Sequence, residues 1–413
     1  MACLRLLLAA SFIALAAGGA TATGFRFEEA TIDSIHRGFN NGSLTSTALV
    51  RYYLGQIARL NPQLHAVIEV NPDALRDAAR ADAERASSSS GGHRRAAAAG
   101  GLHGVPVLVK DLIATRDRLN TTAGSFALLG AVAKRDAGVV ARLRRAGAVV
   151  LGKSNLPEWG NFRSAKGLDG WSARGGQAMN PYVLTVDPCQ ASTGSAIAAA
   201  ANMAAFLKVD GLCGKRIGIP NGFFNSKNGT VKYRVYKKHI DTLRKHGATV
   251  IENLDIANLS VIQDITKSGF LAAAPAEFKF NLNNYLSNLS YTPVRSLAEI
   301  IAFNNAHPVE STTGIGPRER AAIHHMNELS ANGLEKLMKE HQLDAIFTPD
   351  SSVATVLAYD GLPGIEVPAG YDEKGVPFGI CFGGLKGYEP RLIEMAYAFE
   401  QATKVRKPPV IKA

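Results

Sequence analysis

The sequence predicts a single α/β domain in which a central mixed β-sheet is flanked by helices on both faces. Two similar units, at residues 143–150 and 243–250, each join the end of a helix to a glycine stop and an apolar strand. This is the second half of a βαβ crossover, the unit from which helix-covered sheets are built. The chain has 413 residues, of which 46% are hydrophobic and 20% charged, so it is long and apolar enough to bury a substantial core.

The N-terminal residues 1–22 are typical of a signal peptide. Arg5 supplies the positive end, residues 6–17 the apolar stretch and residues 20–22 a small-residue cleavage site. The apolar stretch is short for a membrane span, and the alternative is a signal anchor. We expect a protein of the secretory pathway, in the extracellular space, with no stable membrane insertion once the signal is removed.

Asn-x-Ser/Thr sequons fit that secretory route. They begin at Asn41, Asn120, Asn228, Asn258 and Asn288.

The N-terminal part of the domain is predicted to be helical. Residues 27–60 carry apolar side chains at helical spacing and are divided by an Asn-Asn-Gly sequence at 40–42, which predicts two helices. Residues 73–86 form an Ala/Arg-rich helical pattern. The Ser-, Gly- and Ala-rich segment 87–101 is low in complexity, and we expect a disordered loop there.

The strands follow from short apolar runs. Residues 105–109 predict a strand that ends at Lys110, and residues 136–146 a helix stopped by Gly147, after which 148–151 form a buried strand. In the last third of the chain, further strands are predicted at 343–349, 364–368 and 377–382, with a final helix at 390–402.

Several sequence features do not indicate a ligand site. Residues 147–154 match the phosphate-loop pattern, but their middle is a buried strand where a phosphate loop needs exposed backbone N–H groups. The pair His324 and His325 lacks metal-ligand spacing and is expected on a solvated helix face.

The formal net charge is +11, yet the basic residues are dispersed, so we expect no nucleic-acid partner, no metal and no cofactor. Three cysteines remain after the signal, too few for a disulfide framework.

Lys110 and a cluster of small residues at 187–196 are the candidates for chemistry. A lysine acts as a general base only if its pKa falls well below about 10.4, and burial at a strand end is one way to achieve this. Around these two segments, long motifs occur in a fixed order: 104–111, 121–125, 136–155, 171–176, 180–182, 187–189, 363–370 and 375–380.

These motifs resemble the amidase signature family, serine hydrolases of carboxylic amide C–N bonds, and are closest to its plant-type members. The resemblance covers roughly residues 25–408. It implies a catalytic triad in which a lysine deprotonates a bridging serine, which in turn deprotonates the nucleophilic serine. Lys110 matches the lysine, whereas the bridging position is Ala191; Ser192 and Ser195 match other positions of the family run.

The nucleophile itself has no counterpart in the sequence. In the family a Gly-Gly-Ser segment follows shortly after the bridging serine and also supplies the oxyanion hole. Here no Ser or Thr occurs between residues 196 and 225, and the sequence after Ala205 resembles a later part of the family. The comparison with the family pattern therefore predicts an internal deletion at 205/206.

The sequence thus predicts an amidase relative that is catalytically defective. Two alternatives remain open: a non-catalytic relative that binds an amide-like small molecule or a partner chain, and a truncated splice product. We expect Lys110, Ser192 and Ser195 to lie close together as remnants of the site, with Ala191 between them. We also expect an open groove beside Lys110, lined by Ala198, Ala201 and Met203. The oligomeric state is not predicted.

Overall fold

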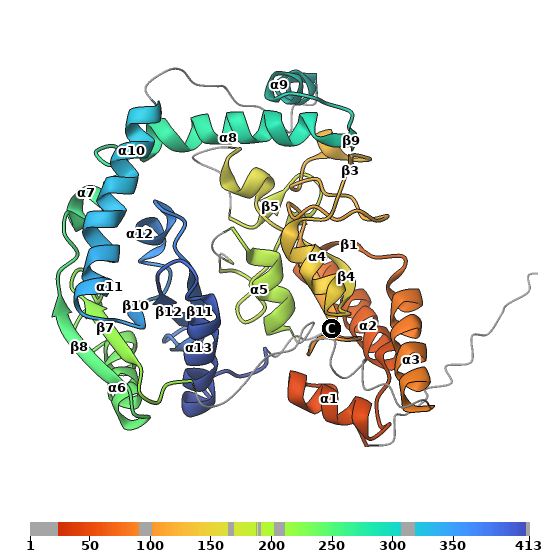
Figure 1. Ribbon diagram of the computed structural model, residues 1–413, viewed down its shortest axis with the longest axis horizontal. Coiled ribbons are helices and arrows are strands. Elements are labelled where there is room, and N and C mark those ends of the chain that lie inside the picture. Colours follow the sequence, from red (N-terminus) through yellow and green to blue (C-terminus); the bar gives the residue numbers. More distant parts are fainter. Residues whose placement is uncertain are drawn as a thin grey trace, which may run out of the picture.

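Two mixed β-sheets, each covered by helices, form the framework of the molecule (Figure 1). The computed structural model describes residues 24–90, 101–163, 169–186, 188, 191–201, 211–306 and 319–409. The predicted signal peptide, residues 1–22, and the predicted junction at 205/206 lie outside these residues. No helix within the described ranges is both long and apolar enough to cross a bilayer.

The smaller of these sheets carries Lys110. Its strand order is β1-β4-β2, with β4 antiparallel to β1 and parallel to β2. The strands are β1 (Val67–Val70), β4 (Val149–Ser154) and β2 (Pro106–Lys110). Helix α4 (Gly138–Arg145) connects β2 to β4, so the first predicted crossover is confirmed as a βαβ unit.

The larger sheet has five strands in the order β11-β12-β10-β7-β8. They are β7 (Arg216–Pro220), β8 (Thr249–Leu254), β10 (Ala345–Pro349), β11 (Gly364–Tyr371) and β12 (Pro377–Gly383). Strands β7 and β8 are parallel and are joined by α6 (Val231–Lys245), which confirms the second predicted crossover. Two short pairs complete the strands: β3 (Val132–Ala133) with β9 (Leu289–Tyr291), and β5 (Trp171–Ser172) with β6 (Gly176–Gln177).

The predicted α/β domain, with mixed β-sheet flanked by helices on both faces, is confirmed, and the sheet has a finer division than the sequence predicted. The strands divide into two separate larger sheets. Within the described residues, no strand pairs with an edge strand of both, and without such a strand the hydrogen-bond ladder stops at each edge.

Helices cover both faces of the three-stranded sheet. On one face lie α1 (Ile32–Asn40), α2 (Ser46–Leu64), α3 (Ala74–Ser90) and α5 (Thr193–Ala200), whose buried apolar residues join those of the sheet in one core cluster. On the opposite face, α4 packs through Val140 against Val109 and Val150. The two predicted N-terminal helices are confirmed. Residues 87–90, expected in a disordered loop, instead form the end of α3, and residues 91–100 lie outside the described part of the chain.

The five-stranded sheet is also covered on both faces. Helices α6 and α13 (Glu389–Thr403) share one core cluster with its strands. On the other face lie α7 (Leu259–Gln263), α10 (Glu319–Ser330), the π-helical turn Ala331–Glu335, α11 (Lys336–Glu340) and α12 (Ala354–Ala358). The histidine pair at 324 and 325 is exposed on α10, as predicted.

Helix α8 (Phe270–Ser287) joins the two parts and lies along the top of the view in Figure 1. Near its start, Ala273 belongs to a core cluster of the five-stranded sheet. Near its end, Leu282 and Leu286 pack with residues 123–133 of the Lys110 half. Helix α9 (Leu297–Ala306) and the 3₁₀ turns Phe126–Leu128 and Glu158–Asn161 complete the helices.

A β-bulge in β4 sets which side chains face α5. Val107 of β2 pairs with Val150, but the next residue, Leu108, pairs with Gly152, so Leu151 is an extra residue in β4. An extra residue reverses the alternation of side chains beyond it. Consequently Ser154 shares the α5 face with its neighbour Lys110 and contacts Ser195, while the side chain of Lys153 contacts Ile113 and Thr121.

Candidate functional site

Lys110 lies at the carboxyl end of β2 and contacts the start of α5. Its Nζ donates a hydrogen bond to the Oγ of Ser192, at 3.2 Å. The side chain is half-buried, and burial lowers the pKa of Lys110 below its ordinary value. A lysine of this kind is closer to a usable base than a solvated one.

The small-residue cluster leads into α5. Ser192 is the exposed residue that precedes the helix, and Ala191 before it is half-buried. Ser195 lies in the first turn, where its Oγ is 2.7 Å from the Oγ of Ser154. The structure therefore brings Lys110 to Ser192 and Ser195 to Ser154.

Ser154 is a site residue that the sequence analysis did not identify. It is fully buried and pairs in register with Lys110 across β2 and β4. Ser154 is the last residue of the phosphate-loop-like run 147–154, whose middle the sequence predicts to be a buried strand. The sequence therefore places Ser154 at the end of this strand. The bulge at Leu151 decides which face the side chain takes, and no residue pattern marks that bulge.

The prediction that Ala198 and Ala201 line an open groove beside Lys110 is wrong. Both side chains are buried in the core cluster beneath α5 and are at most 5% exposed. They pack against α2 and the three-stranded sheet because this face of α5 is apolar, so they line no open surface. Met203 lies outside the described residues.

A buried polar network supports Lys110 from the opposite face. The neighbouring Asp111 is fully buried, and its Oδ2 accepts hydrogen bonds from the Thr122 hydroxyl and from the Gly124 N–H, the latter at 3.0 Å. Arg174 forms an ion pair with Asp111 at 3.6 Å. Burial raises the pKa of Asp111, and these partners oppose the rise. The network fixes the chain where β2 ends.

Lys153 belongs to the same buried network. Its side chain is completely buried, and its Nζ donates to the carbonyl oxygen of Ile113 at 2.6 Å and to Thr121 Oγ1 at 2.8 Å. Burial lowers the pKa of Lys153 to about 8, while the nearby carboxylate of Asp111 raises it. These contacts hold Lys153 away from the Ser192 face.

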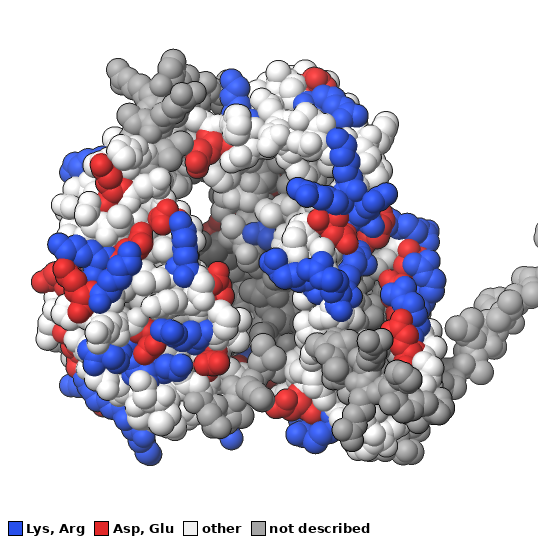
Figure 2. All heavy atoms as spheres, viewed as in Figure 1, with Lys and Arg blue, Asp and Glu red and all other residues white. Residues whose placement is uncertain are grey.

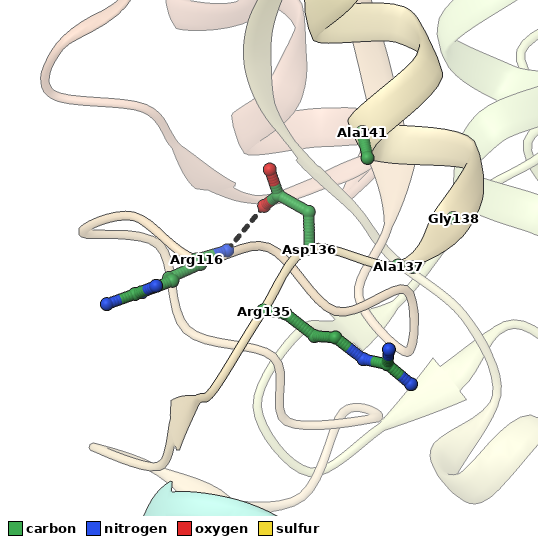
Figure 3. A pocket seen from close by; sticks show the side chains of 6 residues that line it. All are labelled: Arg116, Arg135, Asp136, Ala137, Gly138 and Ala141. Carbon is green, nitrogen blue, oxygen red and sulfur yellow. Dashed lines mark hydrogen bonds between the residues drawn. The ribbon is translucent and has the colours of Figure 1, made fainter.

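Figure 2 shows that the surface is hollowed between the two halves of the molecule. A separate cavity of about 590 Å³ opens at the start of α4 and is lined by Arg116, Arg135, Asp136, Ala137, Gly138 and Ala141 (Figure 3). None of the predicted site residues lines this cavity.

Among the residues that the structure describes, no group of three metal-ligating side chains is arranged to hold an ion. Cys213 and Cys381 are both free thiols.

Comparisons with known proteins converge on one family. A family model described as Amidase matches residues 48–207. A probable amidase of Arabidopsis thaliana is 43% identical over 487 aligned positions, which cover 93% of this chain and 92% of that protein.

Solved structures agree. A peptide amidase from Stenotrophomonas maltophilia superposes with a TM-score of 0.79 at 31% identity, covering 94% of this chain and 100% of that one. An amidase family protein from Bacillus anthracis superposes with a TM-score of 0.80 at 27% identity and 92% coverage of each chain.

Proposed function

Because this chain belongs to the amidase family, we propose that it keeps the family's amide-binding scaffold but does not hydrolyse amides efficiently. The observation that carries the proposal is the alanine at position 191, where the family has its bridging serine, next to the Ser192 that Lys110 contacts. A lysine–serine–serine relay needs a hydroxyl between the base and the nucleophile. The methyl group of Ala191 has no acidic proton, so it cannot take part in such a relay.

A missing internal block at 205/206 is the second part of the proposal. The alignment with the Arabidopsis relative has 487 positions, more than the 413 residues of this chain, so the relative contains residues without a counterpart here. The family model stops matching at residue 207, next to the proposed junction. The division of the strands into two sheets also fits the loss of a segment that, in the family, contributes strands around the site. The nucleophile and the oxyanion hole would be lost with it.

A slow lysine–serine dyad is the second candidate, favoured by the 3.2 Å contact between Lys110 and Ser192. In a dyad, Lys110 would take the proton of the Ser192 hydroxyl directly. Each absent oxyanion donor is expected to cost about 10²–10³ in rate, so such an enzyme would be slow.

The ligand we propose is a small carboxylic amide, and the compartment is the secretory pathway. A non-catalytic partner-binding role and a truncated splice product are the competing explanations. Sequencing of transcripts across 205/206 separates the splice product from the others, because a full-length transcript from the same gene would contain the missing block.

Labelling with a fluorophosphonate probe tests the proposal, since the probe reacts only with an activated serine. The protein, its Lys110→Ala variant and its Ser192→Ala variant are compared, with the Stenotrophomonas peptide amidase as the positive control. We expect labelling and aryl-amide hydrolysis no greater than those of Lys110→Ala. The single change Ala191→Ser should not restore either, because the nucleophile is still absent.

Positive labelling identifies the serine responsible. Signal abolished by both Lys110→Ala and Ser192→Ala supports the dyad. Signal that depends on Lys110 but survives in Ser192→Ala points to Ser195 instead. Either result overturns the proposal of a defective enzyme.

A further inference from the structure

The structure separates the sequons by how each asparagine side chain is held. In the described part of the chain, three of the five asparagines are exposed and donate no hydrogen bond from Nδ2, whereas the side chain of Asn120 is tied into a hydrogen-bonded cluster. We propose that Asn41, Asn228 and Asn258 carry N-linked glycans in the folded protein and that Asn120 does not. The proposal is independent of amide hydrolysis and rests on the secretory route.

Asn228 lies in an open surface turn. It lies in the turn between β7 and α6, its side chain is exposed, and it makes no hydrogen bond within the described residues. Gly229 follows with a φ of +86°, which turns the chain sharply at the surface. Thr230, the third sequon residue, caps α6 by accepting a hydrogen bond from the Tyr233 N–H at 3.3 Å. A glycan at Asn228 would project into solvent without disturbing that cap.

Asn41 and Asn258 are comparably open. Asn41 is the exposed residue that ends α1, and its Oδ1 accepts hydrogen bonds from the backbone N–H and the hydroxyl of Ser43. Within the described residues its Nδ2, the atom that would carry the sugar, makes no hydrogen bond. Asn258 is exposed just before α7, and in the described part of the chain its side chain likewise makes none.

Asn120 differs because its side chain is part of the network around the site. It is half-buried, its Nδ2 lies 3.1 Å from both carboxylate oxygens of Glu69, and its Oδ1 accepts the Gly130 N–H at 2.9 Å. Glu69 in turn pairs with Arg174. A sugar on Nδ2 would break this cluster, so folded protein should be unmodified there.

Asn288 is outside the proposal, since it is exposed but its Nδ2 donates to both the carbonyl oxygen and the Oδ1 of Asn284.

The modification is a group transfer from a lipid-pyrophosphate-linked oligosaccharide, catalysed by a membrane-bound transferase. The asparagine Nδ2 forms a bond to the anomeric carbon of the sugar and loses one proton. The bond between that carbon and the pyrophosphate oxygen breaks, and the lipid pyrophosphate leaves with the bonding electrons. The result is a bulky, hydrophilic group, which a protein tolerates only on its surface.

Site mapping on the whole chain tests the assignment. The chain, with its own residues 1–22, is expressed in eukaryotic cells, and folded protein is recovered from the medium or the microsomal lumen. Glycans are released enzymatically in heavy-oxygen water, which marks each formerly glycosylated asparagine as labelled aspartate. We expect label at Asn41, Asn228 and Asn258 and none at Asn120. Label at Asn120, absence of label at any of the three, or recovery only from the cytosol overturns the proposal.

Variants at Thr230 provide a matched control for folding. Thr230→Asp destroys the sequon but keeps an N-cap acceptor for α6, and Thr230→Ser keeps both. Thr230→Asp should migrate faster on a gel by one glycan, as Asn228→Gln does, while Thr230→Ser and Asn120→Gln should migrate like the parent protein. An unchanged mobility of Thr230→Asp would contradict a glycan at Asn228.

Discussion

At the scale of single residues, Gly124 holds the loop whose N–H binds Asp111. Its φ is +78°, and a Cβ added there would lie 2.5 Å from the Cβ of Ser172. Gly124→Ala therefore meets two costs: the left-handed backbone, roughly 1–2 kcal/mol, and overpacking, typically about 1–3 kcal/mol. We expect the free energy of unfolding to fall by about 2–5 kcal/mol in urea denaturation.

A substitution at Gly130 separates the cost of the left-handed backbone from the cost of overpacking. Its φ is +85°, but an added Cβ would meet no atom within 4 Å. Gly130→Ala should therefore lose only about 1–2 kcal/mol, the cost of the backbone conformation. Equal losses in the two variants would show that the contact with Ser172 is easily relieved.

Lys153 makes the stability of the protein depend on pH. Its folded pKa of about 8 lies below its ordinary value of 10.5, so the unfolded chain binds the proton more tightly. The resulting destabilisation is complete below pH 8 and is lost as the pH rises toward 10.5. Relative to a Lys153→Met variant, the parent protein should gain roughly 2–3 kcal/mol in unfolding free energy between about pH 7 and pH 10.

Urea denaturation at several pH values measures this gain, and Lys134→Met, which removes an exposed lysine, controls for the loss of one charge. The difference between variants cancels the titration of tyrosines. Parallel pH profiles for the parent and Lys153→Met would mean that Lys153 is not held charged in a buried site.

At the scale of elements, the bulge in β4 explains what sequence could and could not predict about the site. The apolar run predicts the strand, and Lys110 is correctly placed at the end of β2. Strict alternation from Val149 and Leu151 would put Lys153, not Ser154, on the α5 face. The bulge is set by tertiary pairing with β2, so Ser154 could not be recognised from its own neighbours.

The hydroxyl pair of Ser154 and Ser195 fixes the start of α5 on β4. The two Oγ atoms are 2.7 Å apart, and Ser154 is fully buried. A double-mutant cycle of Ser154→Ala and Ser195→Ala should give a coupling free energy of about 1 kcal/mol, the usual net contribution of a hydrogen bond. Pairing Ser154→Ala with Thr348→Val, in the other sheet, is the control and should be additive within about 0.5 kcal/mol. Additivity in the serine pair would contradict this role.

At the scale of the whole molecule, the sequence predicted individual strands and both crossovers but not their division into two sheets. Local hydrophobic patterns determine which residues form strands, whereas the pairing of strands depends on every segment between them. Within the described residues, no buried apolar cluster combines side chains of the two larger sheets. This arrangement fits the proposed loss of a connecting segment.

Restoring that segment is the direct test of the proposed deletion. The block that the Arabidopsis relative carries at this junction, expected from the family pattern to include a Gly-Gly-Ser sequence, is inserted between Ala205 and Phe206, alone and together with Ala191→Ser. Only the combined variant regains the nucleophile, the oxyanion donors and the bridging hydroxyl. Its aryl-amide hydrolysis should exceed that of the parent chain by at least ~10², since one oxyanion donor alone contributes that much. Changing the grafted nucleophilic serine to alanine should abolish the gain. Equal activity of the parent chain and the combined variant would show that no catalytic block is missing.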